Sequence, residues 1–278
     1  MFDRRLVPPL LRSSGVQVVL LVVLLQFTPT LFHMYLSKFT SRPDMQNQHR
    51  VTRPITMTLR SATLRDLDAI TNLGLASLHD DPVWPYRFPW ARIYPKVHYK
   101  YSRIRFEEYL ESVDMGLIQC MVIEIPDEDD PSASKIIAFS MWSLPKSWRP
   151  TDGTEPGIKR PSDHPERRDA SAARMLEFRK ELAMAKKLYF DPEFGDEQLN
   201  LMILATHPDY RRRGAATALL HWGMEEAEIK GVGVTLFSSP MGLPLYRKNG
   251  FEQVGMVHVQ VDGEKEYIKL PAMVWRPP

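Results

Sequence analysis

The stretch HPDYRRRGAATALL, His207–Leu220, sets three consecutive arginines directly before Gly214 and a run of small residues. The preceding segment, QLNLMILATHP, is almost continuously apolar, as expected for a strand that is covered on both faces. Beyond the glycine, Ala216, Leu219, Leu220, Gly223 and Ala227 recur at helical spacing up to Gly231. The stretch therefore predicts a strand, a basic loop and a helix in immediate succession.

A junction of this kind is suited to binding an anion. The first N–H groups of a helix lack intrahelical acceptors, and the helix dipole adds positive charge at the same end. Gly214 and the alanines after it leave the main chain uncovered, and guanidinium groups match phosphate oxygens. A solvated basic turn is the alternative, which the flanking strand and helix disfavour. Neither a Walker loop nor a Gly-x-Gly-x-x-Gly fingerprint is present.

The composition is that of an ordinary globular protein. In 278 residues, 25% are charged and 44% are apolar, and 36 basic against 34 acidic residues leave a formal charge of +2. This near balance disfavours a dedicated nucleic-acid binder. Cys120 is the only cysteine, which excludes an internal disulfide and a cysteine-based zinc site, and we expect it to fill the core.

The N-terminal segment, residues 1–36, differs from the rest of the chain. Its stretch from Gly15 to Leu36 is mostly apolar and approaches the roughly 20 residues that a membrane helix needs. Three interpretations remain open: a membrane anchor, a true start at Met57 with an erroneous upstream gene model, and a signal or transit segment. The slight excess of basic residues after the stretch favours a cytoplasmic location for the rest of the chain. Residues 37–56 are polar and aperiodic, which is typical of a linker.

Residues 57–278 are expected to form one α/β domain, strictly α+β. Thr63 and Asp66 form a capping-box signature before a helical pattern, and Asp262-Gly263 predicts a tight hairpin turn. The polar segment 145–168 contains five prolines, so we expect an irregular insertion that acts as a lid or is disordered. The expected strands are a short one at Met57 and 116–125, 135–144, 198–208, 232–239, 251–261 and 266–275; the expected helices are 63–78, 98–113, 170–188, 215–230 and 243–249.

Two motifs resemble a known family. Pro208-x-Tyr210-Arg211-x-x-Gly214-x-Ala216 is similar to motif A of the GCN5-related N-acetyltransferase (GNAT) superfamily, and SSPMGLPLYRKNGFEQVG resembles its motif B. The residues of both motifs most resemble those of fungal members of the superfamily. The resemblance covers about Met57 to Trp275 and implies the GNAT fold, a mixed and mostly antiparallel sheet with helices on both faces.

The resemblance also implies an acetyl-CoA site. The main chain of Leu204, Ala205 and Thr206 would meet the pantetheine arm, and Ser239 would assist there. A second group would hold the pyrophosphate: Arg211, Arg212, Arg213, Gly214, Ala215, Ala216 and Thr217. No metal is required.

Tyr246 matches the family tyrosine that protonates the departing thiolate, and its alternative is a role as a core aromatic. Glu197 is our candidate for the general base, with Asp196 and Glu124 as alternatives. The expected reaction is acetyl transfer to an amine, with a small molecule favoured over a histone tail. A regulatory module that binds acyl-CoA without efficient catalysis is the alternative. The acceptor would lie near the aromatic-rich segment 80–94 and the insertion.

Overall fold

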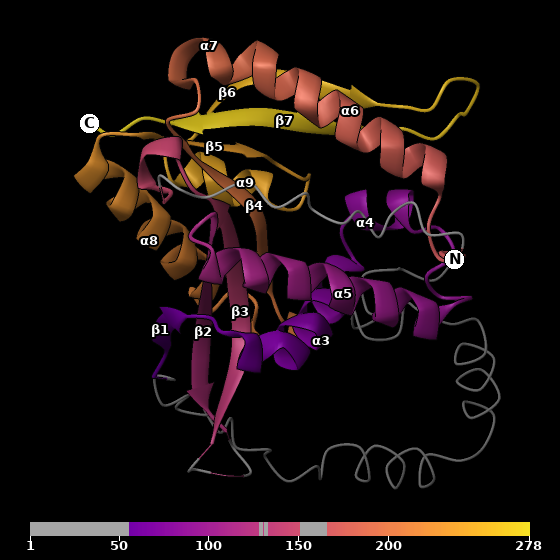
Figure 1. Ribbon diagram of the computed structural model, residues 1–278, viewed down its shortest axis with the longest axis horizontal. Coiled ribbons are helices and arrows are strands. Elements are labelled where there is room, and N and C mark those ends of the chain that lie inside the picture. Colours follow the sequence, from indigo (N-terminus) through magenta and orange to yellow (C-terminus); the bar gives the residue numbers. More distant parts are fainter. Residues whose placement is uncertain (1–55, 128–129, 131–132, 151–165) are drawn as a thin grey trace, which may run out of the picture. The chain divides into compact units, whose positions relative to one another are not determined.

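A mixed seven-stranded sheet forms the centre of the part of the chain described by the computed structural model, residues 56–127, 130, 133–150 and 166–278 (Figure 1). Only β4 and β5 are parallel, and every other neighbouring pair is antiparallel. The strands, in spatial order, are β1 (Thr58–Ser61), β2 (Ile118–Pro126), β3 (Ser134–Ser143), β4 (Gln198–Thr206), β5 (Gly233–Phe237), β7 (Ile268–Trp275) and β6 (Glu252–Val259).

Helices cover both faces of this sheet. On one face, α8 (Ala215–Lys230) packs on β2 to β5. On the other face, α3 (Leu67–Leu78) and α5 (Pro95–Asp114) lie together over β2 to β4, and α6 (Ala172–Tyr189) covers β6 (Figure 1). The shorter helices are α4 (Val83–Arg87), α7 (Asp191–Phe194) and α9 (Leu243–Lys248), with 3-10 turns η3 (Leu64–Asp66), η4 (Lys146–Trp148) and η6 (Pro208–Tyr210).

The mixed fold predicted from the sequence is confirmed. The segment after β2 joins two antiparallel strands as a hairpin, and Thr63 and Asp66 form the expected capping box. The ladder at Asp262-Gly263 is shorter than predicted: β6 ends at Val259 and β7 begins at Ile268. Gly263 still makes a turn with φ of 78°, closed by the N–H of Glu264 on the carbonyl of Val261, but the flanking residues leave the ladder.

The predicted N-terminal segments lie outside the described residues, as does most of the insertion. Within the described ranges, no helix combines the length and apolar character needed to cross a membrane. Cys120 is buried in the core between the sheet and α3, where burial raises the pKa of its thiol to about 12.

A buried polar cluster fixes the segment between α3 and α5. His98 on α5 accepts a hydrogen bond at Nε2 from Trp84 Nε1 (3.0 Å), so its Nδ1–H donates to Asp169 (2.8 Å). Arg167 donates to both oxygens of Asp169, whose side chain is fully buried. Burial opposes the charge of Asp169, but the bonds from His98 and Arg167 outweigh it and lower its pKa to about 2. Charge pairing therefore joins α4, α5 and the start of α6.

Close packing of α8 on the sheet depends on Gly223, because a Cβ there would collide with the indole ring of Trp142. We expect Gly223→Val to lower the free energy of unfolding by about 1–3 kcal/mol through overpacking. Chemical denaturation measures this loss. Ala218→Val, at an exposed position of the same helix, is the control and should cost less than about 1 kcal/mol. Equal losses in the two variants would contradict the packing argument.

Asp169→Asn should destabilise the protein by about 2 kcal/mol or more at neutral pH, because it removes a paired charge and leaves Arg167 buried. The pKa of Asp169 is depressed in the folded state, so its stabilisation is complete above the ordinary value of 3.8 and is lost as the pH falls through about 2. The difference between the native protein and the variant should therefore shrink between pH 4 and pH 2. Asp68→Asn, which removes an exposed ion pair with Arg103, serves as the control and should cost under about 1 kcal/mol throughout.

Candidate functional site

The two parallel strands separate halfway along β4. Their pairing ends at Leu201 and Leu236, whereas β3 continues to pair with β4 as far as Thr206. From Met202 onward, one edge of β4 therefore has no neighbouring strand. Such an edge offers main-chain N–H and C=O groups to an extended ligand.

A β-bulge marks the point of separation. Met141 of β3 is opposite Ile203 while Trp142 is opposite Leu201, so Met202 is an extra residue on β4. The bulge exchanges the faces of the strand: Leu201 packs in the α8 core, and Ile203 packs in the α3 core. The bulge thus changes which face of the sheet each β4 side chain occupies at the point where the strands separate.

Polar side chains hold the closed end of the two strands together. Thr235 Oγ1 of β5 donates to Gln198 Oε1 (2.8 Å), and Asn200 Nδ2 of β4 donates to Thr235 Oγ1 (3.0 Å). Gln198 and Thr235 are buried, so these bonds are shielded from water. The position of the separation is therefore fixed by paired groups as well as by strand register.

The N-terminus of α8 carries no side-chain cap. Gly214 precedes the helix with φ of 93°, and the first turn contains no acidic residue. The N–H groups of Ala215, Ala216 and Thr217 find no acceptor in the described chain. Open space surrounds the Cα of Gly214, so the predicted bare helix start is present and faces outward.

The three arginines of the loop have different partners. Arg211 bonds to Asp80, to the Ser77 carbonyl and to the Thr206 carbonyl. Arg213 donates to the carbonyl of Asp209 and stacks over Tyr210. Arg212 has φ of 65° and is exposed, and its guanidinium bonds to no described residue. Only Arg212 of the three therefore has its donors unengaged within the described part of the chain.

Residues 204–206 lie on the unpaired part of β4. The side chain of Ala205 is buried in the α3 core, and Leu204 packs partly against the α8 core. Thr206 Oγ1 is buried and has no hydrogen-bond partner within the described residues. The main chain of these residues, rather than their side chains, borders the gap.

Tyr246 lies on α9, which follows β5. Because β4 and β5 are parallel, α9 and the arginine loop leave the sheet at the same edge. The ring of Tyr246 is buried against Phe251, and its hydroxyl makes no hydrogen bond to a described residue. Burial, with a smaller contribution from the charge of Asp81, raises the pKa of this phenol well above 10.0. Ser239 accepts a bond from the Gly242 N–H (3.3 Å) and shapes the turn before α9.

The carboxylates of two predicted bases, Glu197 and Glu124, have hydrogen-bond or ion-pair partners. Glu197 precedes β4 at its closed end and accepts bonds from the Ser147 N–H and hydroxyl. It is separated from the arginine loop by the length of β4, about 30 Å at roughly 3.3 Å per residue. Glu124 pairs with Arg60 (2.9 Å), and the carbonyl of Asp196 accepts from Lys146.

Asp81 lies in the loop expected near the acceptor but was not proposed as a base from the sequence, and its charge contributes to the raised pKa of the Tyr246 phenol. Asp81 Oδ1 accepts the Val83 N–H (3.0 Å) at the start of α4. An aspartate that accepts the N–H of the residue two positions on forms a common Asx turn, and that signal alone does not indicate a catalytic environment.

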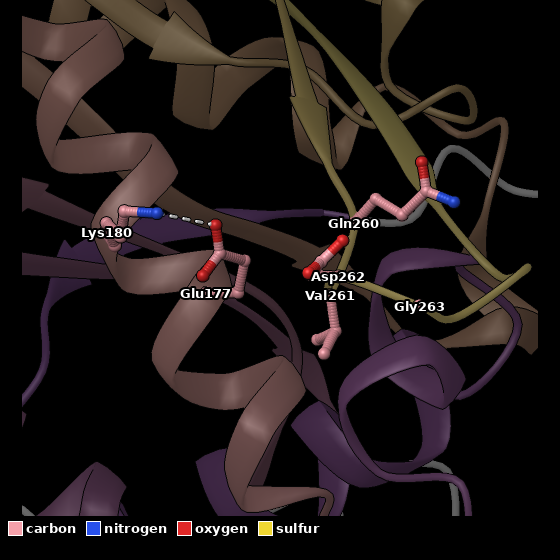
Figure 2. A pocket seen from close by; sticks show the side chains of 6 residues that line it. All are labelled: Glu177, Lys180, Gln260, Val261, Asp262 and Gly263. Carbon is pink, nitrogen blue, oxygen red and sulfur yellow. Dashed lines mark hydrogen bonds and ion pairs between the residues drawn. The ribbon is translucent and has the colours of Figure 1, made fainter.

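The described residues also contain potential metal ligands and a pocket away from the arginine loop. No group of three or more His, Cys, Asp or Glu side chains suited to a metal ion occurs in residues 56–127, 133–150 or 166–278. Figure 2 shows a hollow between α6 and the β6–β7 turn, where Lys180 pairs with Glu177. It contains none of the predicted cofactor residues; its lining is Glu177, Lys180, Gln260, Val261, Asp262 and Gly263.

Comparisons with known proteins agree with the resemblance. Residues 175–253 match the family model of the acetyltransferase (GNAT) domain. A protein named acetyltransferase from Stachybotrys chartarum is 24% identical over 217 residues, which cover 75% of this chain and 86% of that protein.

Two solved structures are also similar in shape. A histone acetyltransferase HPA2-related protein from Corynebacterium glutamicum has a TM-score of 0.48 and 18% identity, covering 81% of this chain and 97% of its own. A mosquito arylalkylamine N-acetyltransferase-like 5b protein has a TM-score of 0.48 and 16% identity, and the match covers 80% of this chain and 100% of that protein. The family match over residues 175–253 and the similarity to the acetyltransferase from Stachybotrys chartarum support membership of the GNAT superfamily, whose sheet topology this chain shares.

Proposed function

We propose that the protein transfers an acetyl group from acetyl-CoA to the amine of a small molecule. The observation that carries this proposal is the convergence of three features at one edge of the sheet: the unpaired part of β4, the bare N-terminus of α8, and the free hydroxyl of Tyr246. Each would interact with one part of acetyl-CoA. The unpaired part of β4 would bind the pantetheine arm, the α8 N-terminus would bind the pyrophosphate, and Tyr246 would donate to the departing sulfur.

The pyrophosphate would bind the N–H groups of Gly214 to Thr217. These donors have no competing acceptor, and the dipole of α8 favours negative charge at this end. Arg212 would supply an exposed guanidinium beside it, since its donors are unengaged in the described chain. The pantetheine arm would then lie along Leu204 to Thr206 and use the main chain as a strand would.

The chemical step would be direct attack. The neutral amine nitrogen adds to the thioester carbonyl, the carbon–sulfur bond breaks, and the nitrogen gives up its extra proton to water. The thiolate takes a proton from Tyr246, which recovers one from that water. The amine must lose a proton first, and we assign that role to Asp81 rather than Glu197, because Glu197 is held by Ser147 at the closed end of the strands. Ser239 would position Tyr246 through the turn before α9.

Tyr246→Phe should lower kcat by about tenfold to a hundredfold and leave the KM for acetyl-CoA nearly unchanged. The lost group is a proton donor to a thiolate that is itself a modest base, so the effect lies near the lower end of general-acid contributions. Because the pKa of Tyr246 is raised above 10.0, the native enzyme should keep this donor protonated at pH 9.5. Release of free thiol in the presence of a panel of primary amines measures the rate.

The alternative function is acyl-CoA binding without efficient catalysis. The unengaged hydroxyl of Tyr246 weighs against it, since a purely binding module has no use for a donor there. Equal rates for Tyr246→Phe and the native protein would favour this alternative.

Gly214→Ala should weaken acetyl-CoA binding by about fivefold to thirtyfold. A Cβ at φ of 93° costs roughly 1–2 kcal/mol, so the loop would shift and misplace the N–H groups. Gly263→Ala is the matched control, because Gly263 has a similar φ of 78° and open space but lies in the β6–β7 turn. Calorimetry should give that control the native dissociation constant within twofold. Unchanged binding in Gly214→Ala would remove the support for a main-chain phosphate site.

A further inference from the structure

Arg211 links the end of β4 and its own loop to a segment that is far away in the sequence, residues 77–80. Its Nη1 pairs with Asp80 Oδ2 (3.0 Å), and its Nη2 donates to the Ser77 carbonyl at the end of α3 (3.0 Å). Its Nε donates to the Thr206 carbonyl at the end of β4 (3.4 Å). The guanidinium thus bonds to acceptors on the α3 side of the loop, and the sequence interpretation had instead assigned it to phosphate.

The backbone of Arg211 belongs to the proposed phosphate loop. The next residue, Arg212, has φ of 65°, an uncommon conformation for a residue with a side chain, and Gly214 follows with φ of 93°. A ligand that holds the N–H groups after Gly214 would also hold this conformation. Fixing the loop would then fix the position from which the Arg211 side chain reaches Asp80 and Ser77.

The segment that Arg211 holds leads directly to the proposed chemistry. Asp80 precedes Asp81, whose carboxylate starts α4 through the Val83 N–H and raises the pKa of Tyr246. The hydrogen bond from Arg211, with a further contribution from His79, lowers the pKa of Asp80, so this carboxylate stays charged at neutral pH. The contact is therefore a charged bond between the cofactor loop and the acceptor side.

We propose that Arg211 is a positioning residue that transmits coenzyme A binding at α8 to the segment from Ser77 to Val83, and so places Asp81 for the acceptor amine. This inference rests on the proposed function of the α8 N-terminus. If coenzyme A binding raises the affinity for the acceptor by some factor, acceptor binding must raise the affinity for coenzyme A by the same factor.

Amide hydrogen exchange of the full chain with and without coenzyme A tests this proposal. In the native protein, coenzyme A should slow exchange in two places: the first turn of α8 and residues 78–87. Asp80→Ala should keep the first effect and lose at least four-fifths of the second, with the dissociation constant for coenzyme A within threefold of the native value. Asp80→Glu should restore most of the protection.

Asp209→Ala is the matched control, since this carboxylate lies in the same loop, is 80% exposed, and makes no bond to Arg211. It should retain both effects. Protection of residues 78–87 that persists in Asp80→Ala, or is missing in the native protein while α8 is protected, would overturn the coupling and leave the proposed function standing. Absence of protection at α8 as well would overturn the proposed function and the coupling with it.

Discussion

The separation of β4 from β5 is the constraint on which the rest of the structure depends. Two parallel strands that remained paired would satisfy each other's main chain and leave no room for a ligand. Here the pairing stops at Leu201, the bulge at Met202 turns the strand, and the polar bonds of Thr235 hold the closed end. The site therefore arises from an interruption of regular structure that the surrounding sheet keeps in place.

In the proposed site, positive charge would come from the main chain as well as from arginine side chains. The bare first turn of α8 supplies directed donors, whereas Arg211 and Arg213 are largely committed to protein acceptors. Donors held by the backbone lose little entropy when an anion binds, and this preorganisation favours affinity. In the proposed site, the exposed guanidinium of Arg212 would add side-chain donors to those of the main chain.

Local patterns allowed much of this fold to be predicted from the sequence. Helical spacing and the glycines at positions 214 and 231 located α8 and its uncapped start. Two β-rich runs separated by a Pro- and acid-rich connection located the β2–β3 hairpin. The contacts that define side-chain roles are not local. Asp80 lies 131 residues from Arg211, and Ser147 lies 50 residues from Glu197, so no spacing rule revealed that these groups were engaged. The bulge at Met202 likewise reflects pairing with β3 and has no sequence signal.

The central claim is that uncovered main chain at the start of α8 holds the diphosphate of coenzyme A. A crystal structure of the complex tests it most directly. We expect pyrophosphate oxygens within about 3 Å of N–H groups between Arg212 and Thr217, as in ordinary charge-assisted hydrogen bonds. A diphosphate bound only by side chains, or bound away from the first turn of α8, would contradict this account.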